Sequence, residues 1–156
     1  VSVTQIHSAE VRYTTEEDRG GGIFYKADYE CDGYIADRPG IAPCVKTADC
    51  VPILFSSGDG IVGAVHAGWR GTARGIAGVC VEKMVALGAK RERITAAIGP
   101  SIGFCCYEVG EDFYSELEEC TRMSESHKKF AKRAFEIRDK EFEQIYQEYK
   151  KSLDER

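Results

Sequence analysis

The chain has 156 residues, of which 43% are hydrophobic and 30% are charged, and its formal net charge is -5. Such a composition indicates one soluble globular domain with a sizeable core and excludes a disordered or fibrous protein. The sequence contains neither a basic patch with interleaved aromatic residues nor an apolar run of membrane-spanning length. Nucleic acid and membrane surfaces are therefore not expected partners, and we expect a cytoplasmic protein.

The N-terminal part of the sequence favours short strands and turns. Alternating or apolar residues predict strands at 1–6, 10–13 and 41–46. A charged, glycine-ending stretch at 14–22 predicts a loop, and Pro39 with the glycine after it predicts a turn.

An apolar hairpin is the clearest local prediction. Residues 51–55 and 61–65 are apolar and partly β-branched, and the Ser-Ser-Gly-Asp-Gly string between them is typical of a turn. If the turn is centred near Gly58, Cys50 lies directly opposite His66, and opposed Cβ atoms are roughly 5 Å apart. A thiol and an imidazole at that distance are either two metal ligands or a nucleophile and its base.

The remaining sequence predicts helices around one buried strand. Apolar residues recur at nearly helical period over 72–87, and Gly88 is a plausible C-cap. Residues 94–98 predict a buried strand, 112–120 predict a helix, and apolar positions between 130 and 153 predict an amphipathic helix.

The start of the first of these helices is a candidate anion site. Arg70, Gly71 and Thr72 connect the His66 segment to the helix, with Thr72 near the N-cap. Free amides at a helix N-terminus favour an anion such as phosphate, and an arginine coincides with them. The alternative is a strand-to-helix turn that simply requires glycine.

The seven cysteines indicate reduced thiols rather than disulfides. Their number is odd, Cys105 and Cys106 are adjacent, and no CxxC motif occurs. Cys31, Cys80 and Cys120 lie among apolar or helical neighbours and are expected to be small core side chains.

Four motifs resemble those of one known family, the purine nucleoside phosphorylase or laccase-domain family. It was formerly called multicopper polyphenol oxidase and includes the peptidoglycan editing factor. The motifs are QIHS at 5–8, TADCVP at 47–52, HAGWRG at 66–71 and GPSIGFCCYEV at 99–109. The resemblance implies an α/β (α+β) fold, a mixed-sheet sandwich flanked by helices and similar to the cytotoxic necrotizing factor sandwich. It also implies one zinc ion bound by His7, Cys50 and His66.

The positions of the cysteine and histidine residues support a metal site independently of the resemblance. Two ligands from a hairpin and one distant imidazole make a site with three protein ligands and an open fourth position, which is typical of catalytic zinc. Among the three histidines, His127 lies in a serine- and lysine-rich break and is expected to be solvated. Three imidazoles are too few for a multicopper oxidase, although copper on the same three ligands, with weak phenol oxidation, stays an alternative.

The resemblance implies two reactions of purine nucleosides. One is phosphorolysis of adenosine, inosine or methylthioadenosine, with phosphate held by Arg70, Gly71 and Thr72; the other is deamination of adenosine. The expected pocket residues are Cys106 and Tyr107. Asp49 and Glu108 are candidates for proton handling or for orienting a ligand, and equally for hydrogen-bond acceptors in loops.

Two other classes of protein stay open. In a Cys-His deamidase, Cys50 would be the nucleophile and His66 its base, but such a dyad has no use for His7. In a metal-stabilised binding module without catalysis, Trp69, Phe104 and Tyr107 would form a binding surface.

We expect a zinc-binding domain over 1–121 and a separate amphipathic segment over 122–156. Compared with the family, the chain lacks a segment before the first motif and another at the C-terminal end. The hypothesis is that a partner chain, or a homodimer through the terminal helix, completes the site.

Overall fold

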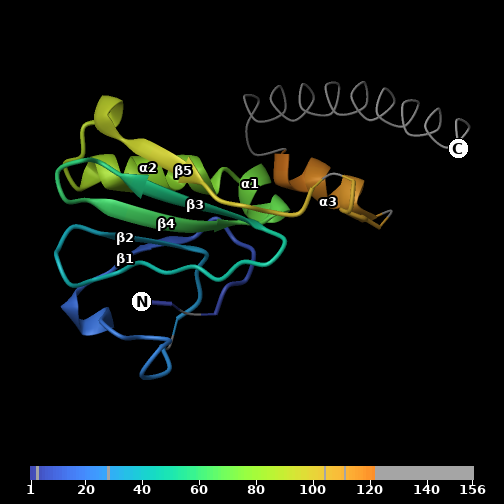
Figure 1. Ribbon diagram of the computed structural model, residues 1–156. Coiled ribbons are helices and arrows are strands. Elements are labelled where there is room, and N and C mark those ends of the chain that lie inside the picture. The colour runs from blue at the N-terminus through green and yellow to red at the C-terminus, as the bar shows by residue number, and fades with distance from the viewer. Residues whose placement is uncertain (3, 28, 104, 111, 122–156) are drawn as a thin grey trace, which may run out of the picture.

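A five-stranded mixed sheet with strand order β1-β2-β4-β3-β5 forms the centre of the fold (Figure 1). The computed structural model describes residues 1–2, 4–27, 29–103, 105–110 and 112–121. The first pair of strands, β1 and β2, is parallel, and the other three pairs are antiparallel. This arrangement confirms the predicted α/β class with a mixed sheet. The strands are β1 Val11–Tyr13, β2 Gly33–Ala36, β3 Val51–Ser56, β4 Val62–Ala67 and β5 Thr95–Ile98.

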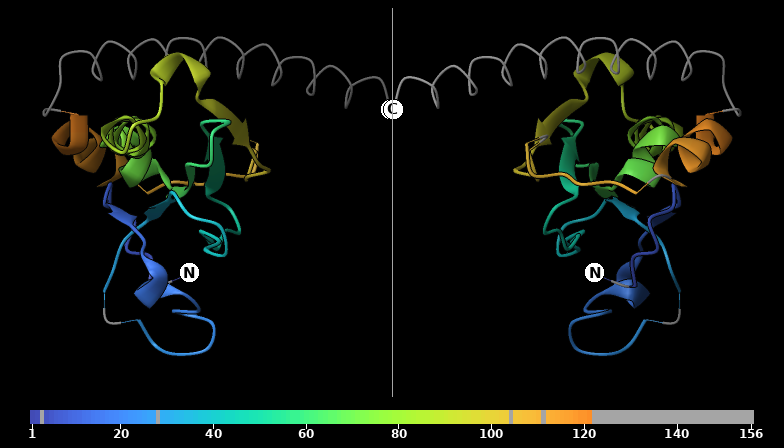
Figure 2. Two further views of the ribbon diagram at one scale, coloured as in Figure 1. Left: turned by 90° about the vertical axis from the view of Figure 1, so that its left-hand side faces the viewer. Right: turned by 90° about the vertical axis from the view of Figure 1, so that its right-hand side faces the viewer.

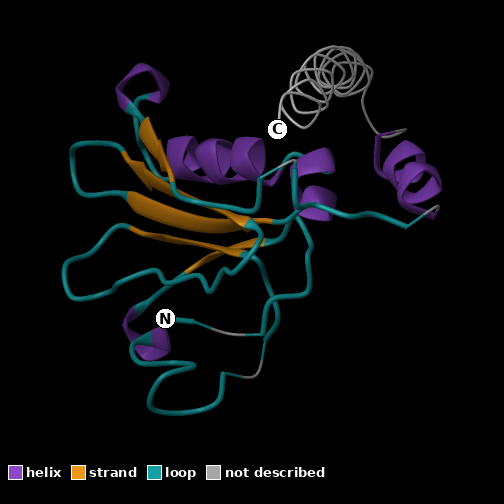
Figure 3. Ribbon diagram, turned by 45° about the vertical axis from the view of Figure 1, so that its right-hand side comes forward, coloured by secondary structure: helices purple, strands orange, loops and turns teal. Residues whose placement is uncertain are grey.

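Helices lie on one face and at one end of this sheet (Figures 2 and 3). Helix α2 packs against β4, β2 and β1, while the short α1 follows β4 directly and contacts α3. No helix in the described ranges is long and apolar enough to cross a bilayer. The helices are α1 Trp69–Ala73, α2 Ile76–Ala86 and α3 Asp112–Thr121, with 3-10 turns η1 Glu16–Asp18 and η2 Arg91–Arg93.

The main core lies between α2 and the sheet. Ile76, Cys80 and Met84 recur at helical spacing on α2 and are fully buried against Val65 and its neighbours. A Cβ on Gly63 of β4 would lie only 2.8 Å from the Cys80 Sγ, so this close approach requires glycine. A smaller cluster on the opposite face contains Val1, Cys31, Tyr34, Ala36 and Ile41. The predicted burial of Cys31 and Cys80 is confirmed.

The hairpin is present, but its predicted register is wrong by two residues. His66 pairs with Pro52, and Cys50 lies one residue before β3 begins. The turn is centred on Asp59 because Ser57 closes it: the Ser57 amide donates to the Ile61 carbonyl at 3.0 Å, and the Ser57 Oγ accepts the Ile61 amide. Cys50 is therefore a diagonal neighbour of His66 rather than its partner, and both still face the same side of the sheet.

Two predicted strands are absent, at 1–6 and at 41–46. Within the described part of 1–6, only Thr4 forms a bridge, with Glu30. The two segments contact each other instead, since the Cys44 amide donates to the Val1 carbonyl at 2.9 Å. Pro43 lacks an N–H, which disfavours a regular ladder over 41–46.

The helix predicted over 72–87 is divided in two and begins earlier than expected. Gly68 is the N-cap of α1, so Thr72 lies inside that helix rather than at its start. Gly75 has a left-handed φ of 78° and separates α1 from α2. Gly88, with a φ of 106°, follows the end of α2 as predicted.

The strand predicted at 94–98 exists as β5, but its predicted burial is wrong. All four residues of β5 are exposed, and Ile98 is 73% exposed beside the half-exposed Leu54 of β3. The strand lies at the edge of the sheet. Within the part of the chain that the structure describes, no element covers the side chains of β5. The helix predicted at 112–120 is confirmed as α3. The amphipathic segment over 122–156 and the side chains of Phe104 and Cys120 lie outside what the structure describes.

Candidate metal centre

Three potential metal ligands from distant parts of the sequence meet at one end of the sheet. His7 lies in the loop before β1, Cys50 directly precedes β3, and His66 is the penultimate residue of β4. One donor atom from each lies within 4.8 Å of the other two. The imidazole rings of His7 and His66 meet edge to face, with centroids 4.9 Å apart. His66 is buried, Cys50 is half-buried and His7 is exposed, so the cluster opens toward solvent.

The donor set fits a metal ion of intermediate softness. Thiolate and imidazole ligands lie about 2.0–2.3 Å from zinc, and donor atoms at most 4.8 Å apart are close to such an arrangement. Three protein ligands leave one position of a tetrahedron for another molecule. The arrangement therefore suits a metal that acts on a substrate better than a purely structural ion.

Asp32 is the functional residue that the sequence did not reveal. Its fully buried carboxylate accepts a hydrogen bond from Nδ1 of His66, with Oδ1 at 2.8 Å. An ionised carboxylate can only accept, so the proton is on Nδ1 and Nε2 of His66 is left for a metal. The available signal was a charged residue directly before the buried β2, between Cys31 and Gly33.

The same carboxylate also holds the segment that carries His7. It accepts backbone N–H bonds from Ile6, His7 and Ser8 at 3.2, 3.0 and 2.7 Å, and a bond from the Ser8 hydroxyl at 2.7 Å. These bonds stabilise His7 in a left-handed conformation with a φ of 59°, which is unfavourable for a residue other than glycine. Asp32 thus positions two of the three ligands.

Opposing effects set the protonation of Asp32. Burial, the largest influence, raises the pKa of this carboxyl, but the hydrogen bonds from His66, Ser8 and Ile6 together outweigh it. The pKa is therefore below its usual value, and Asp32 is ionised at neutral pH.

Two glycines allow the approach of α1 to the ligands. A Cβ on Gly68 would lie 2.8 Å from Cδ2 of His7 and 3.1 Å from Sγ of Cys50. A Cβ on Gly71 would lie 2.7 Å from the Ser8 carbonyl oxygen. Gly68 is thus explained by packing against His7 and Cys50, and Gly71 by packing against the backbone of Ser8, the residue after His7.

Cys50 and Tyr107 lie close enough to affect each other electrostatically. Burial raises the pKa of the Cys50 thiol, and the neighbouring Asp49 raises it further. Burial also raises the pKa of Tyr107, and the Cys50 thiolate adds to this effect. Tyr107 is therefore a neutral hydrogen-bond donor beside the cluster at neutral pH.

Arg70 is held by an ion pair. Its Nε and Nη2 donate to Oε2 of Glu116 on α3 at 2.8 and 2.5 Å, and its guanidinium lies 4.4 Å from the ring centroid of Trp69. The Thr72 amide donates to the Gly68 carbonyl at 2.8 Å, so it is not free for an anion. Arg70, the charged member of the predicted anion site, is thus paired with Glu116 in this structure.

A shallow cleft of about 210 Å³ brings several predicted site residues together. Arg70, Tyr107 and Glu108 line it, whereas Asp49 and Cys106 do not. Asp49 is exposed, and its carbonyl accepts the Ile102 amide at 2.9 Å. The remaining lining residues are Trp69, Val109, Gly110, Phe113 and Glu116.

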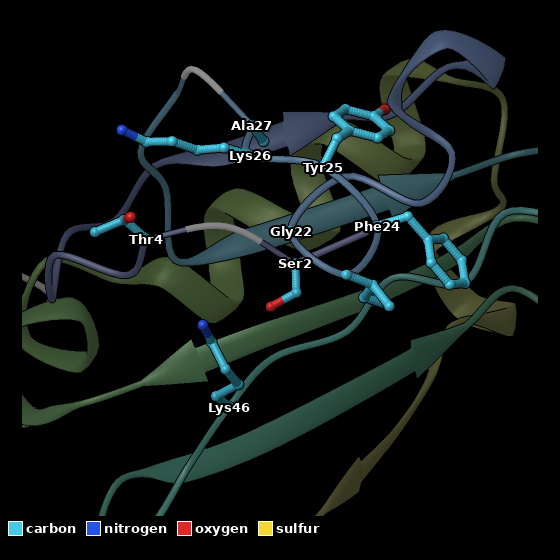
Figure 4. Close-up of a pocket in the computed structure, with 9 residues that line it drawn as sticks. Ser2, Thr4, Gly22, Phe24, Tyr25, Lys26, Ala27 and Lys46 are labelled. Atoms are coloured by element: carbon cyan, nitrogen blue, oxygen red, sulfur yellow. The ribbon is translucent and has the colours of Figure 1, made fainter.

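A second hollow, of about 350 Å³, lies elsewhere, and none of the three candidate ligands lines it. Figure 4 shows Ser2, Phe24, Tyr25 and Lys46 around it. The Ser2 Oγ is buried and has no hydrogen-bond partner among the described residues. No pattern in the sequence predicted this hollow.

A mixed α/β sheet with a His-Cys-His cluster at its end is typical of an α/β protein with a metal site. A family model described as multi-copper polyphenol oxidoreductase laccase matches residues 1–154. The chain belongs to this family, as the motifs predicted.

Relatives of this chain carry enzyme names. It is 44% identical over 125 residues to purine nucleoside phosphorylase YlmD of Geobacillus stearothermophilus, covering 75% of this chain and 44% of YlmD. It is 51% identical over 82 residues to adenosine deaminase RL5 of an unknown prokaryotic organism, covering 52% of this chain and 31% of RL5. The chain thus spans less than half the length of these relatives.

Solved structures support the fold. The crystal structure of Bacillus licheniformis hypothetical protein YfiH matches with a TM-score of 0.63 and 35% identity, over 74% of this chain and 45% of YfiH. The crystal structure of YlmD from Geobacillus stearothermophilus matches with a TM-score of 0.57 and 38% identity, over 76% of this chain and 46% of YlmD.

Proposed function

We propose that this chain carries the zinc site of a purine nucleoside phosphorylase, which cleaves adenosine, inosine or methylthioadenosine with phosphate. The observation that carries the proposal is the convergence of His7, Cys50 and His66 around one point, with Asp32 holding two of them. The names of relatives such as YlmD supply the substrate class.

His7, Cys50 and His66 would hold the ion. When bound, zinc supplies Lewis-acid polarisation of a substrate atom. Asp32 keeps Nε2 of His66 directed at the site and keeps His7 in its left-handed conformation. A rigidly positioned ligand set lowers the reorganisation that binding a substrate requires.

Arg70 is the residue proposed to bind phosphate. A phosphate dianion carries more charge than the Glu116 carboxylate and can accept the same pair of guanidinium N–H bonds. In phosphorolysis a phosphate oxygen forms a bond to C1' of the ribose, the bond from C1' to the purine nitrogen breaks, and the purine leaves with its electron pair. Arg70 positions and neutralises the attacking phosphate.

Tyr107, Glu108 and Asp49 are the candidates for handling the proton. The departing purine nitrogen must be protonated or receive a hydrogen bond. Tyr107 is a neutral donor at neutral pH, as an ordinary tyrosine is, and burial raises its pKa further. It lines the same cleft as Arg70 and Glu108, so we assign it to the substrate side of the site. Cys106 precedes Tyr107 but does not line the cleft, and only the family resemblance assigns it there.

Adenosine deamination is the second candidate reaction. The relative RL5, 51% identical over 82 residues, is named an adenosine deaminase. In deamination, oxygen from water bonds to C6 of the purine, the bond from C6 to the amino nitrogen breaks, and ammonia leaves. This reaction needs no phosphate, so Arg70 would have no direct role in it.

Product analysis distinguishes these reactions. Zinc-loaded protein is incubated with adenosine, with and without phosphate, and the products are separated by chromatography. Adenine that appears only with phosphate supports phosphorolysis, whereas inosine in both samples supports deamination. No product in either sample contradicts the proposed enzyme and favours a binding module.

Metal analysis tests the site itself. Purified protein is expected to hold close to one zinc, and Cys50→Ala is expected to lose it, while Cys44→Ala keeps it as a matched control. Copper in place of zinc would support the alternative metal. A metal-free protein that is alkylated at Cys50 would support the Cys-His deamidase instead.

A further inference from the structure

Cys105 and Cys106 form an exposed pair of thiols outside the candidate metal ligands. Both are free thiols, and their Sγ atoms lie 3.4 Å apart, in hydrogen-bond contact. The hydrogen bond with Cys105 raises the pKa of the Cys106 thiol. The pair is therefore two exposed thiols whose sulfur atoms already lie within hydrogen-bond distance of each other.

The local backbone holds the two sulfur atoms together. The Cys106 amide donates to the Gly103 carbonyl at 3.0 Å, which closes a turn. The Cys105 Sγ packs over Gly103, where a Cβ would lie 3.5 Å from it. The turn orders the backbone that carries both thiols, and their Sγ atoms, 3.4 Å apart, are close enough for one ligand to bind both.

A disulfide is not the natural product of this pair. Cα atoms of consecutive residues are about 3.8 Å apart, whereas those joined by a disulfide usually lie about 4.4–6.8 Å apart. A bond between these sulfur atoms would be strained and easily reduced. A single ion bonded to both sulfur atoms needs no bond between them and avoids this strain.

We propose that Cys105 and Cys106 form a bidentate site for a soft, thiophilic ion, of which trivalent arsenic is the representative. Soft ions prefer thiol ligands over oxygen and nitrogen. With an organic arsenic(III) oxide, two sulfur–arsenic bonds form, the arsenic–oxygen bond breaks, and the two thiol protons leave with that oxygen as one water. No oxidant or reductant is required.

The pair of thiols is next in sequence to a residue of the candidate active site. Tyr107 directly follows Cys106 and lines the cleft that contains Arg70 and Glu108. An occupied dithiol site therefore lies at the rim of the candidate active site.

Phenylarsine oxide tests this inference directly. One equivalent is added to the zinc-loaded protein, and the adduct is measured by intact mass spectrometry. The adduct is expected to survive excess β-mercaptoethanol and to be removed by dithiothreitol. Losing one of two thiols removes the chelate advantage, so Cys105→Ser and Cys106→Ser are each expected to retain the probe roughly 100-fold more weakly.

Matched variants exclude other thiols. Cys44→Ser, at another partly exposed thiol, and Cys50→Ala, at the candidate metal ligand, are expected to keep the resistant adduct. Far-UV circular dichroism and thermal unfolding show whether each variant is folded, because Cys50→Ala is expected to lose zinc even when it folds. A resistant adduct in the Cys105→Ser/Cys106→Ser double variant, or its loss in Cys50→Ala, overturns the proposal. So does removal of the wild-type adduct by the monothiol.

Discussion

The Asp32 carboxylate lies 2.8 Å from Nδ1 of His66 and also accepts the backbone N–H of His7 at 3.0 Å. One buried side chain therefore connects two ligand-bearing segments that are far apart in the sequence. Hydrogen bonds of this kind orient ligands and raise their basicity, and removing them typically costs about 10–100-fold in metal affinity.

Asp32→Asn is accordingly expected to weaken zinc binding by about 10–100-fold. The asparagine is nearly isosteric but lacks the charge, and it can no longer fix the His66 tautomer and accept all of the backbone bonds at once. Chelator competition measures the affinity. Glu92→Gln, at an exposed position on η2, is the charge-matched control and is expected to bind zinc as the wild type does. Equal zinc affinity in the two variants would show that Asp32 has no positioning role.

Gly68→Ala tests the packing of α1 against the ligands. The new Cβ would lie 2.8 Å from His7 and 3.1 Å from the Cys50 Sγ, so at least one ligand must move and zinc affinity is expected to fall. Gly78→Ala on α2 is the control, because no described atom beyond its chain neighbours and the backbone of its own helix lies within 4 Å of the position that its new Cβ would take. That variant is expected to keep zinc and to gain about 0.5–1 kcal/mol in free energy of unfolding. Calorimetry with and without zinc separates the two effects, and unchanged zinc binding in Gly68→Ala would contradict the packing argument.

Features that depend on residues close together in the sequence were predicted well, whereas features that depend on residues far apart were not. The hairpin, α3 and the end of α2 at Gly88 depend on local patterns and were predicted correctly. Asp32 was missed because its partners lie 24 to 34 positions away along the chain. The hairpin register was wrong because the hydrogen bonds of one side chain, Ser57, decide where the turn closes.

Burial was harder to predict than strand formation. The apolar pattern of β5 predicts a strand correctly, but exposure depends on which element covers the strand, and a local pattern does not contain that information. The family motifs located His7, Cys50 and His66 without any structure. They did not reveal that Glu116 engages Arg70, because nothing in the α3 segment indicates which residue its carboxylates contact.

The ion pair between Arg70 and Glu116 leads to a prediction for the phosphorolysis reaction. Glu116→Gln removes the competing charge, so the KM for phosphate is expected to fall about two- to fivefold, in line with a partly exposed pair worth about 0.5–1 kcal/mol. Arg70→Gln is expected to raise the KM for phosphate while leaving zinc content unchanged. Glu119→Gln, an exposed position on the same helix, is the control. A higher KM in Glu116→Gln would show instead that Glu116 positions Arg70 for phosphate.

Asp18 provides a prediction for stability that is independent of the metal. Its carboxylate accepts the Thr15 amide at 2.8 Å and the Tyr29 hydroxyl at 3.0 Å, beside the Arg12 guanidinium. Burial raises the pKa of Asp18, but these contacts outweigh it and leave the pKa below the usual 3.8. The stabilisation is therefore fully present above about pH 4–5 and is lost as the pH falls through the folded-state pKa.

Asp18→Asn is thus expected to lower the free energy of unfolding at pH 7 by about 1.5–3 kcal/mol, the usual range for hydrogen bonds to a charged group. Thermal unfolding of the metal-free wild type and variant between pH 2 and pH 7 measures the difference. It should be constant near neutrality and shrink in the acid range. Tyr29→Phe keeps the ring under Arg12 and removes only the hydroxyl, so it should show a smaller loss with the same pH dependence. A difference between wild type and Asp18→Asn that does not change with pH would mean that the charge of Asp18 does not contribute.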